Sequence, residues 1–248
     1  MSRVCLVVPC YNEAQRLNVA AFREFLAASH DVRLIFVDDG SRDATHQVLE
    51  AVRVGYDDKV DLLRCEKNSG KAEAVRLGIL RALDQFQPEL VGFWDADLAT
   101  PLNAVERLRG VLEAHAEFDM IFGARVKLLG RHVERLAIRH YLGRIFATLV
   151  SNLLGMAIYD TQCGAKLFRV KPFTRQILAQ PFLSKWVFDV EIIARYLALV
   201  NRDPKQLEKV IYEYPLETWT DVAGSKIHSG DFFVALWDLL KIYRRYLA

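Results

Sequence analysis

Two aspartates, Asp95 and Asp97, follow directly on the apolar run in the stretch LVGFWDADLATP, residues 90–101. If that run forms a strand, side chains two positions apart point to the same face, and the two carboxylates lie close enough to repel each other. Such a pair is costly unless a cation lies between the carboxylates or one of them takes up a proton. Mg²⁺ is commonly bound through one or two carboxylates together with substrate phosphates. The alternative is an Asp-rich turn that is merely solvated, and the rest of the chain must decide between the two.

Apolar runs alternate with helical patterns along the first half of the chain, and these elements must position the carboxylates. The runs predict five strands: RVCLVVP (3–9), VRLIFVDDGS (32–41), KVDLLRC (59–65), LVGFWDAD (90–97) and FDMIFGAR (118–125). Helical patterns follow the first four runs, and the fourth helix turns Leu102, Val105, Leu108 and Leu112 inward. This alternation predicts an α/β fold with a mostly parallel central sheet and helices on both of its faces.

Polar residues follow each of the five predicted strands. They are Asn12 and Glu13, then Asp38 and Asp39, then Asn68 to Lys71, then Asp95 and Asp97, and finally Arg125. Ligands of such sheets bind outside the carboxyl ends of the strands. Because all five groups would meet at that one rim, a binding site is favoured over a solvated turn.

The residue types at this rim suit a diphosphate leaving group, whose negative charge a cation must offset. Two acids with a metal, Lys71 and Arg125 could supply that charge. Asp38 or Asp39 could accept hydrogen bonds from ribose hydroxyls or a base N–H, but DDGSRDAT is also a good turn and N-cap sequence. We expect one of these two acids to cap a helix and the other to bind. The chain has neither G-x-G-x-x-G nor a P-loop sequence, which argues against a dinucleotide enzyme or a P-loop ATPase.

The composition limits the class of protein further. With 52% hydrophobic and 26% charged residues among 248, the chain can bury a sizeable core, and its net charge of +2 does not indicate a nucleic-acid partner. The four cysteines show no metal-binding spacing, which favours reduced thiols in the cytoplasm. The first apolar run is too short for a signal peptide, and no window has the roughly 18 uninterrupted apolar residues of a membrane span. We therefore expect a protein that is soluble or lies on a membrane surface.

Five motifs now establish a resemblance to a known family. VVPCYNE, VDDGSRDAT, NSGKAEAVRLGI, DADLATP and DTQCGAKLFR occur in the order seen in inverting family 2 glycosyltransferases with the GT-A fold. DADLATP and DTQCGAKLFR, together with FDVE and the later GSK, look most like dolichyl-phosphate glucosyltransferases and their prokaryotic polyprenyl-phosphate relatives. The similarity covers about Val7 to Lys226.

The resemblance implies a nucleotide diphosphate sugar as donor, with UDP-glucose favoured, and a polyprenyl or dolichyl phosphate as acceptor, with inversion at the sugar. It implies that Asp95 and Asp97 hold Mg²⁺ or Mn²⁺. The implied nucleotide-sugar site consists of Pro9, Tyr11, Asn12, Glu13, Asp38, Asp39, Gly70, Lys71, Asp95, Ala96 and Gln162.

Two basic amphipathic segments could bind the protein to the surface of a bilayer. One helix face would carry Arg131, Arg135 and Arg139, which follow helical spacing. The C-terminal stretch 229–248 has aromatic and aliphatic residues on one side and Lys241, Arg244 and Arg245 on the other. Such helices can lie in the interface of an anionic membrane. The alternatives are packing on the core or a homo-oligomer face. We accordingly divide the chain into a glycosyltransferase domain, 1–228, and a C-terminal amphipathic helix, 229–248, on the cytoplasmic face of a membrane.

The acceptor decides which residues do the chemistry. A phosphate monoester has a second pKa near ~6, so it is largely anionic at neutral pH and needs positive groups rather than a base. The candidates for holding it are Arg125, Arg131, Arg135, Arg139 and Lys226. A hydroxyl acceptor would instead need a general base, for which Asp189 is the candidate, although Asp189 could also be only the N-cap of the next helix. The expected catalytic set is thus Asp97, Arg125, Asp189 and Lys226.

Two other functions stay open from the residues alone. A soluble family 2 glycosyltransferase acting on a saccharide or small-molecule hydroxyl would share the whole first half of the chain. A sugar-1-phosphate nucleotidyltransferase also uses acids and a metal on an α/β sheet, but it would be expected to open with a glycine-rich loop where this chain has PCYNE.

Overall fold

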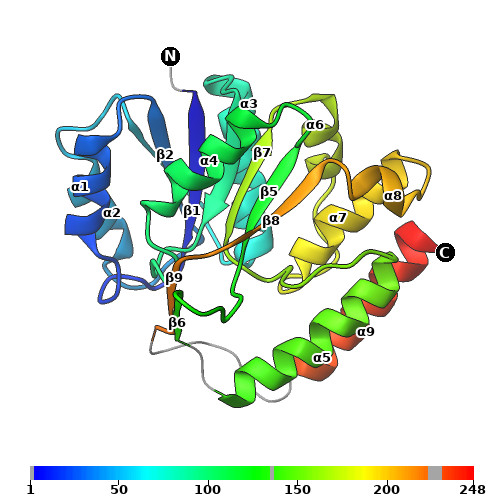
Figure 1. The fold of residues 1–248 in the computed structure, drawn as a ribbon. Helices are drawn as coiled ribbons and strands as arrows, with labels where there is room; N and C mark the ends of the chain where they lie inside the picture. The colour runs from blue at the N-terminus through cyan, green and yellow to red at the C-terminus, as the bar shows by residue number, and fades with distance from the viewer. Residues whose placement is uncertain (1–2, 135–136, 223–230) are drawn as a thin grey trace.

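A seven-stranded sheet forms the centre of the protein, with the strand order β3-β2-β1-β4-β7-β5-β8 (Figure 1). The computed structural model describes residues 3–134, 137–222 and 231–248, with the backbone alone described at 134, 137–140, 142 and 231–233. The strands are β1 (Val4–Cys10), β2 (Val32–Asp38), β3 (Val60–Arg64), β4 (Leu90–Trp94), β5 (Met120–Ala124), β7 (Ala165–Arg169) and β8 (Ile211–Pro215). The five strands expected from the sequence are all present, and the expected α/β fold is confirmed.

The sheet differs from the expectation at one place. The sequence analysis predicted no strand after residue 125, but β7 lies between β4 and β5 and is antiparallel to both. β1 pairs parallel with β2 and β4, and β5 pairs parallel with β8. The sheet is therefore mostly parallel, and its antiparallel strand brings the segment that precedes β7 to the carboxyl ends of β4 and β5.

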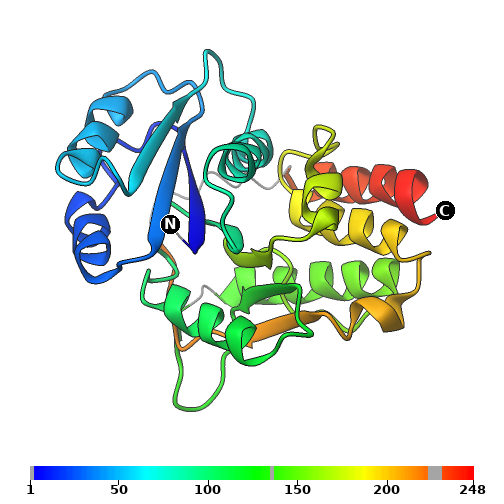
Figure 2. The same ribbon diagram turned by 90° about the horizontal axis from the view of Figure 1, so that it is seen from above.

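Helices cover both faces of the sheet, as Figure 2 shows from above. On one face lie α1 (Val19–Ala28), α2 (Thr45–Arg53) and α4 (Ala104–Ala114); on the other lie α3 (Lys71–Gln85), α5 (Ala137–Leu154), α6 (Pro172–Leu178) and α7 (Phe188–Leu199). Alternate residues of β1 and β2 pack into the two cores: Val7 and Ile35 face α3, whereas Leu6 and Phe36 face α1. A short helix, α8 (Pro204–Leu207), precedes β8. Burial on both faces explains why these strands read as continuous apolar runs.

A small second sheet corrects one expectation about the arginines. β6 (His132–Glu134) pairs in parallel with β9 (Thr218–Thr220), and α5 begins only at Ala137. Arg131 therefore precedes a strand and does not share a helix face with Arg139. Val133 and Trp219 of this small sheet are buried against the main core. The pairing of β6 with β9, more than 80 residues further along the chain, makes this segment a strand, although the spacing of its arginines suggested a helix.

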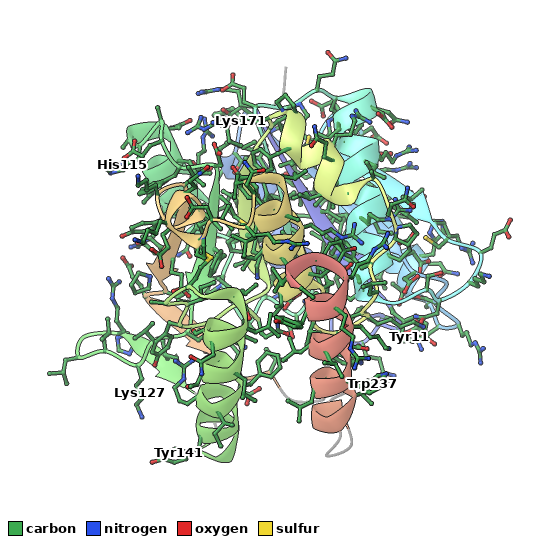
Figure 3. All side chains as sticks on the ribbon, turned by 90° about the vertical axis from the view of Figure 1, so that its right-hand side faces the viewer. Tyr11, His115, Lys127, Tyr141, Lys171 and Trp237 are labelled. Carbon is green, nitrogen blue, oxygen red and sulfur yellow. The ribbon has the colours of Figure 1, made fainter. Side chains whose placement is uncertain are left out.

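The C-terminal helix α9 (Asp231–Ile242) continues into one π-helical segment, η1 (Tyr243–Leu247). Leu239 and Ile242 are buried in the same core cluster as α7, against which α9 and η1 pack. α5 and α9 run in similar directions and project beyond the carboxyl ends of the strands (Figures 1 and 3). Among the described residues, no helix is long and apolar enough to span a membrane.

Candidate active site

Asp95 lies at the centre of the rim, immediately after β4. Its backbone N–H donates to the carbonyl of Gly164 at 3.0 Å, and its carboxylate lies against the α-carbon of Gly164 so closely that any Cβ there would overlap it. Its Oδ1 lies 2.5 Å from the Nζ of Lys71, the first residue of α3. Gly164 is therefore a site residue that the sequence analysis missed, although it belongs to the quoted DTQCG motif.

Asp97 completes the carboxylate pair. Burial and then the charge of Asp95 raise its pKa, as expected for two carboxylates held near each other. Its Oδ1 accepts a hydrogen bond from the Ala99 N–H at 3.1 Å, which fixes the turn. Desolvation lowers the pKa of Lys71, but the carboxylates of Asp95 and Asp189 raise it more, so this lysine is held charged.

The two carboxylates suit a divalent cation whose coordination a bound ligand would complete. Two carboxylates with crowded charge provide oxygen ligands, and Mg²⁺ in proteins takes few protein ligands and keeps places for phosphates and water. No group of three or more His, Cys, Asp or Glu side chains able to hold a metal occurs within the described part of the chain. A cation at Asp95 and Asp97 would thus depend on oxygens brought by the ligand.

Asp38 and Asp39 have different partners, and neither caps α2. The Asp39 carboxylate accepts the N–H groups of Ser69 and Gly70, both at 2.8 Å, and so holds the loop before α3. Burial raises the pKa of Asp39. Asp38 Oδ1 accepts the Ser41 N–H at 2.9 Å inside the turn after β2. The N-cap residue of α2 is Ala44, so the expected capping role of one aspartate was wrong.

The residues after β1 connect the same loops. Asn12, with φ of 53°, donates its N–H to Ser41 Oγ and accepts the Arg42 N–H at its side chain, both at 3.0 Å. The Glu13 N–H donates to Thr45 Oγ1 at 2.7 Å, and the buried carboxylate of Glu13 pairs with Arg16 at 2.5 Å. These bonds join the first two strand ends into one unit. Three further predicted residues lie at the rim: Pro9 within β1, Tyr11 just beyond it, and buried Ala96 between the two aspartates.

Arg125, after β5, is tied to Asp160 by two parallel hydrogen bonds. Its Nε and Nη2 donate to the two carboxylate oxygens at 2.6 and 2.8 Å, and its guanidinium lies 5.3 Å from the Trp219 ring. Burial lowers the pKa of Arg125, but Asp160 raises it more, and the charge of Asp95 adds to this. Glu213 of β8 in turn accepts the N–H groups of Tyr159 and Asp160. Asp160 is a second residue that the sequence analysis missed.

Gln162 follows in the same loop, where its backbone N–H donates to Asp160 Oδ1 at 3.2 Å. Its half-buried side chain bonds to Thr161 Oγ1 at 3.4 Å. The loop between α5 and β7 is thus organised around Asp160.

Asp189 lies in the first turn of α7 and is not its N-cap, which is Val187. Its Oδ1 lies 2.6 Å from the Nζ of Lys166, a fully buried lysine on β7 that also donates to the carbonyls of Thr161 and Cys163. Burial raises the pKa of Asp189, and Lys166 opposes that rise. Lys166 is the third site residue missed, because a lysine inside an apolar strand has no local signal for its partner.

The remaining acceptor candidates are not brought together by the described residues. Arg131 pairs with Glu217 at 3.0 Å. Arg135 and Lys226 lie outside the described residues, and Arg139 lies in α5 with its side chain outside them. Arg125 is the acceptor candidate that the described structure places at the rim beside Asp95.

The fold and this rim define an α/β protein with carboxylates and cations gathered at the carboxyl ends of parallel strands, where sheets of this kind bind their ligands. Residues 5–176 match the family described as "Glycosyl transferase family 2". The dolichyl-phosphate beta-glucosyltransferase of Homo sapiens is 32% identical over 273 residues, covering 99% of this chain and 76% of that protein. A dolichyl-phosphate beta-glucosyltransferase of Trichomonas vaginalis is 29% identical over 95% of this chain and 69% of its own length. The chain belongs to glycosyl transferase family 2.

Solved structures agree in fold. Glucosyl-3-phosphoglycerate synthase from Mycobacterium tuberculosis in complex with UDP superposes with a TM-score of 0.67 at 17% identity, covering 97% of this chain and 80% of that one. The complex of that enzyme with Mn²⁺, UDP-glucose and phosphoglyceric acid gives a TM-score of 0.69 at 18% identity, covering 97% and 79%. These structures share the GT-A fold with this protein, and its membership of glycosyl transferase family 2 makes it a glycosyltransferase.

Proposed function

We propose that the protein transfers glucose from UDP-glucose to a polyprenyl or dolichyl phosphate, with inversion at the sugar. The observation that carries this proposal is that one rim holds Asp95, Asp97, Lys71 and Arg125. Arg125 is close enough to Asp95 for that carboxylate to raise its pKa. The named relatives support the choice of donor sugar and acceptor, because the similarity extends over nearly the whole chain.

On the donor side, Asp95 and Asp97 would hold Mg²⁺ or Mn²⁺ together with the diphosphate. The cation would supply positive charge to the leaving group. Lys71, kept charged by its neighbours, binds the same diphosphate as a point charge. Asp39 and the loop it holds, together with Pro9, Tyr11 and Asn12, would contact the nucleoside. Glu13 would hold the segment after β1 in place through its bond to Thr45.

On the acceptor side, positive charge and not a base is the main requirement, because a phosphate oxygen arrives deprotonated. Arg125 provides a rigid guanidinium whose orientation is set by Asp160. We assign Arg139 and Lys226 to the same acceptor group. Arg131 has its own partner in Glu217, and Arg135 stays a prediction.

The acceptor's lipid chain requires a bilayer surface, and we propose that α5 and α9 provide the contact on its cytoplasmic face. Exposed apolar side chains lie along both helices, at Tyr141, Ile145, Leu149, Val234, Trp237 and Leu240, and Tyr243 at the start of η1 continues them. Tyr141 and Trp237 lie on the parts that project beyond the sheet (Figure 3). Basic residues of the C-terminal segment, Lys241, Arg244 and Arg245, would add attraction to anionic lipid. A homo-oligomer through this face is the alternative.

The direct test is to incubate the protein with labelled UDP-sugars or GDP-sugars, polyprenyl phosphate and Mg²⁺ or Mn²⁺. We expect label from UDP-glucose to enter the organic phase, and we expect EDTA to stop this and added metal to restore it. Label found only on a soluble saccharide would overturn the lipid acceptor. Full transfer in EDTA would overturn the metal.

A further inference from the structure

Lys185 packs against the part of the rim that we propose binds the donor, here called the donor rim: Asp39, Gly70, Lys71, Asp95 and Asp97. The sequence analysis did not select this lysine. It belongs to the loop before α7, and its stem carbons come within 3.1–3.4 Å of the position that a Cβ on Gly70 would occupy. Gly70 has a φ of 98°, a conformation suited to glycine, and precedes Lys71 of the rim. Lys185 thus covers the turn that places Lys71, while its own side chain is exposed.

The charge of Lys185 acts on the rim. Burial raises the pKa of Asp39, and the N–H groups of Ser69 and Gly70 and the positive charge of Lys185 oppose that rise. In the part of the chain that the structure describes, Lys185 has no ion-pair partner. Its ammonium group acts on Asp39 from a side chain whose stem packs against Gly70, the residue before Lys71.

Buried polar groups hold the loop, residues 183–187, in this place. The carboxylate of Glu191, which is fully buried, accepts the Leu183 N–H at 2.8 Å and the Ser184 N–H at 3.3 Å. The Ser184 hydroxyl donates to Asp238 Oδ2 at 2.7 Å and accepts the Val187 N–H at 2.9 Å. Such satisfied buried bonds specify one conformation, because breaking any of them leaves a polar group without a partner.

The C-terminal segment supplies part of this support. Asp238 belongs to α9, and Tyr246 of η1 donates its hydroxyl proton to Glu191 Oε1 at 3.1 Å. Ser184 and Asp238 are both buried, with 1% and 6% exposure. Asp238 of α9 is therefore bonded directly to Ser184, the residue next to Lys185.

We propose that the 183–187 loop is a donor-binding loop: Lys185 supplies a second cation, besides Lys71, to the diphosphate of the bound nucleotide sugar, and α9 sets its position through Asp238 and Ser184. This inference rests on the proposed function for the identity of the donor. Lys185 is a binding residue, and Ser184 and Asp238 are positioning residues. A basic residue that was only solvated would not need a loop fixed by three hydrogen bonds to buried carboxylates of two helices, Glu191 of α7 and Asp238 of α9.

The first experiment measures the dissociation constant of UDP, with Mn²⁺ present, by isothermal titration calorimetry. Lys185→Met should weaken UDP binding about 5- to 20-fold, since a partly exposed charge-assisted hydrogen bond is lost. Lys185→Arg should stay within about 3-fold of the wild type because it keeps the charge. Lys205→Met is the matched control, since this exposed lysine lies on α8, away from the carboxyl ends of the strands (Figure 1). Equal UDP affinity in Lys185→Met and Lys205→Met would overturn the proposal.

The second experiment tests the positioning by a double-mutant cycle. Ser184→Ala should weaken UDP binding about 3- to 10-fold, and the double variant Ser184→Ala/Lys185→Met should bind no worse than Lys185→Met alone. Fully additive losses would show that Ser184 does not act through Lys185 and would overturn the role of α9. Thermal melting of each variant shows whether it is folded, and Asp238→Asn, which keeps an acceptor oxygen for Ser184, should be close to the wild type in UDP affinity.

The outcome is distinguishable from failure of the proposed function. UDP binding that depends on Lys185, in a protein that transfers no glucose to polyprenyl phosphate, would overturn the proposed acceptor and leave the donor loop standing. In an active protein we expect Lys185→Met to raise the KM for UDP-glucose and leave the KM for the lipid acceptor unchanged. A rise in the acceptor KM alone would overturn the assignment to the donor.

Discussion

The proposed donor rim and the proposed acceptor side of this protein are built in different ways. At the donor rim, short motifs after β1, β2, β3 and β4 meet because parallel strands end at the same edge, and the Lys71–Asp95 pair is about one-third exposed on each side, at 36% and 35%. On the acceptor side, charges are tied into pairs across long sequence separations: Arg125 with Asp160 and Lys166 with Asp189, all of them largely buried. The first arrangement keeps charges available to a ligand, whereas the second fixes one guanidinium and one carboxylate in place.

The largest difference should appear in stability. Arg125→Met should lower the free energy of unfolding by about 3–5 kcal/mol, because it leaves the buried Asp160 carboxylate without its partner. Lys71→Met should cost less than about 1 kcal/mol, because the Lys71–Asp95 pair is partly solvated. Urea unfolding of both variants measures this, and equal losses would refute the contrast.

The next effect is on catalysis at the donor rim. Asp97→Asn should lower the rate of glucose transfer about 10²–10³-fold, since a metal ligand that stabilises the leaving group is removed. Asparagine can still accept the Ala99 N–H, so the melting temperature should change little. Asp84→Asn, at an exposed ion pair with Arg175, is the matched control. Activity of Asp97→Asn within about 3-fold of the wild type would contradict the assignment.

The raised pKa of Asp97 predicts the direction of two pH effects, on stability and on metal binding. Burial and Asp95 raise the pKa of Asp97 above that of an ordinary aspartate. The folded protein therefore binds this proton more readily than the unfolded chain, so this group's contribution to stability increases as the pH falls through the raised pKa. Because the proton and the metal compete for this carboxylate, the affinity of the metal-free protein for Mn²⁺ should fall over that same range. Titration with Mn²⁺ at a series of pH values measures this, and an affinity that declines only in the range of an unperturbed aspartate would count against it.

A smaller effect is expected on the acceptor side at Asp189. With a phosphate acceptor, Asp189→Asn should keep its transfer rate within about 10-fold of the wild type, whereas loss of a general base typically costs about 10²–10⁴. Lys226→Ala should lose more and should raise the acceptor KM. Both kcat and KM for polyprenyl phosphate must be measured, because Asp189 also holds Lys166. A collapse of kcat at saturating acceptor in Asp189→Asn, with Lys226→Ala unaffected, would favour a hydroxyl acceptor.

The smallest effect concerns the membrane surface. Trp237→Glu should weaken binding to anionic vesicles about 5-fold at low salt, the equivalent of about 1 kcal/mol, and the wild type should be released at high salt. Val54→Glu replaces an exposed apolar residue that follows α2 and should bind like the wild type. Equal recovery of all three proteins with and without vesicles would remove the membrane contact but not the transferase activity.

The sequence predicted which residues gather at the rim because each part of the rim is local. Asp95 and Asp97 lie within three residues of the end of β4, in a turn and not on the strand face that the spacing predicted, and the turn residues after β1 and β2 lie within a few positions of the strand ends. The partner of each aspartate could not be predicted in the same way. Asp39 holds the loop of Ser69 and Gly70, about thirty residues away, because β2 and β3 are neighbours in the sheet.

What the sequence alone determined is the alternation of strands and helices, the edge at which polar residues collect, and the family. The tertiary structure decided the rest. It inserted β7 antiparallel between β4 and β5, which brought Gly164 against Asp95 and Lys166 against Asp189, and it paired β6 with β9 where helical spacing had suggested an arginine face. The physical reason is that hydrophobic period and turn chemistry are encoded by neighbouring residues. Strand order and buried ion pairs, in contrast, depend on which distant segments bury the most surface together and satisfy each other's polar groups.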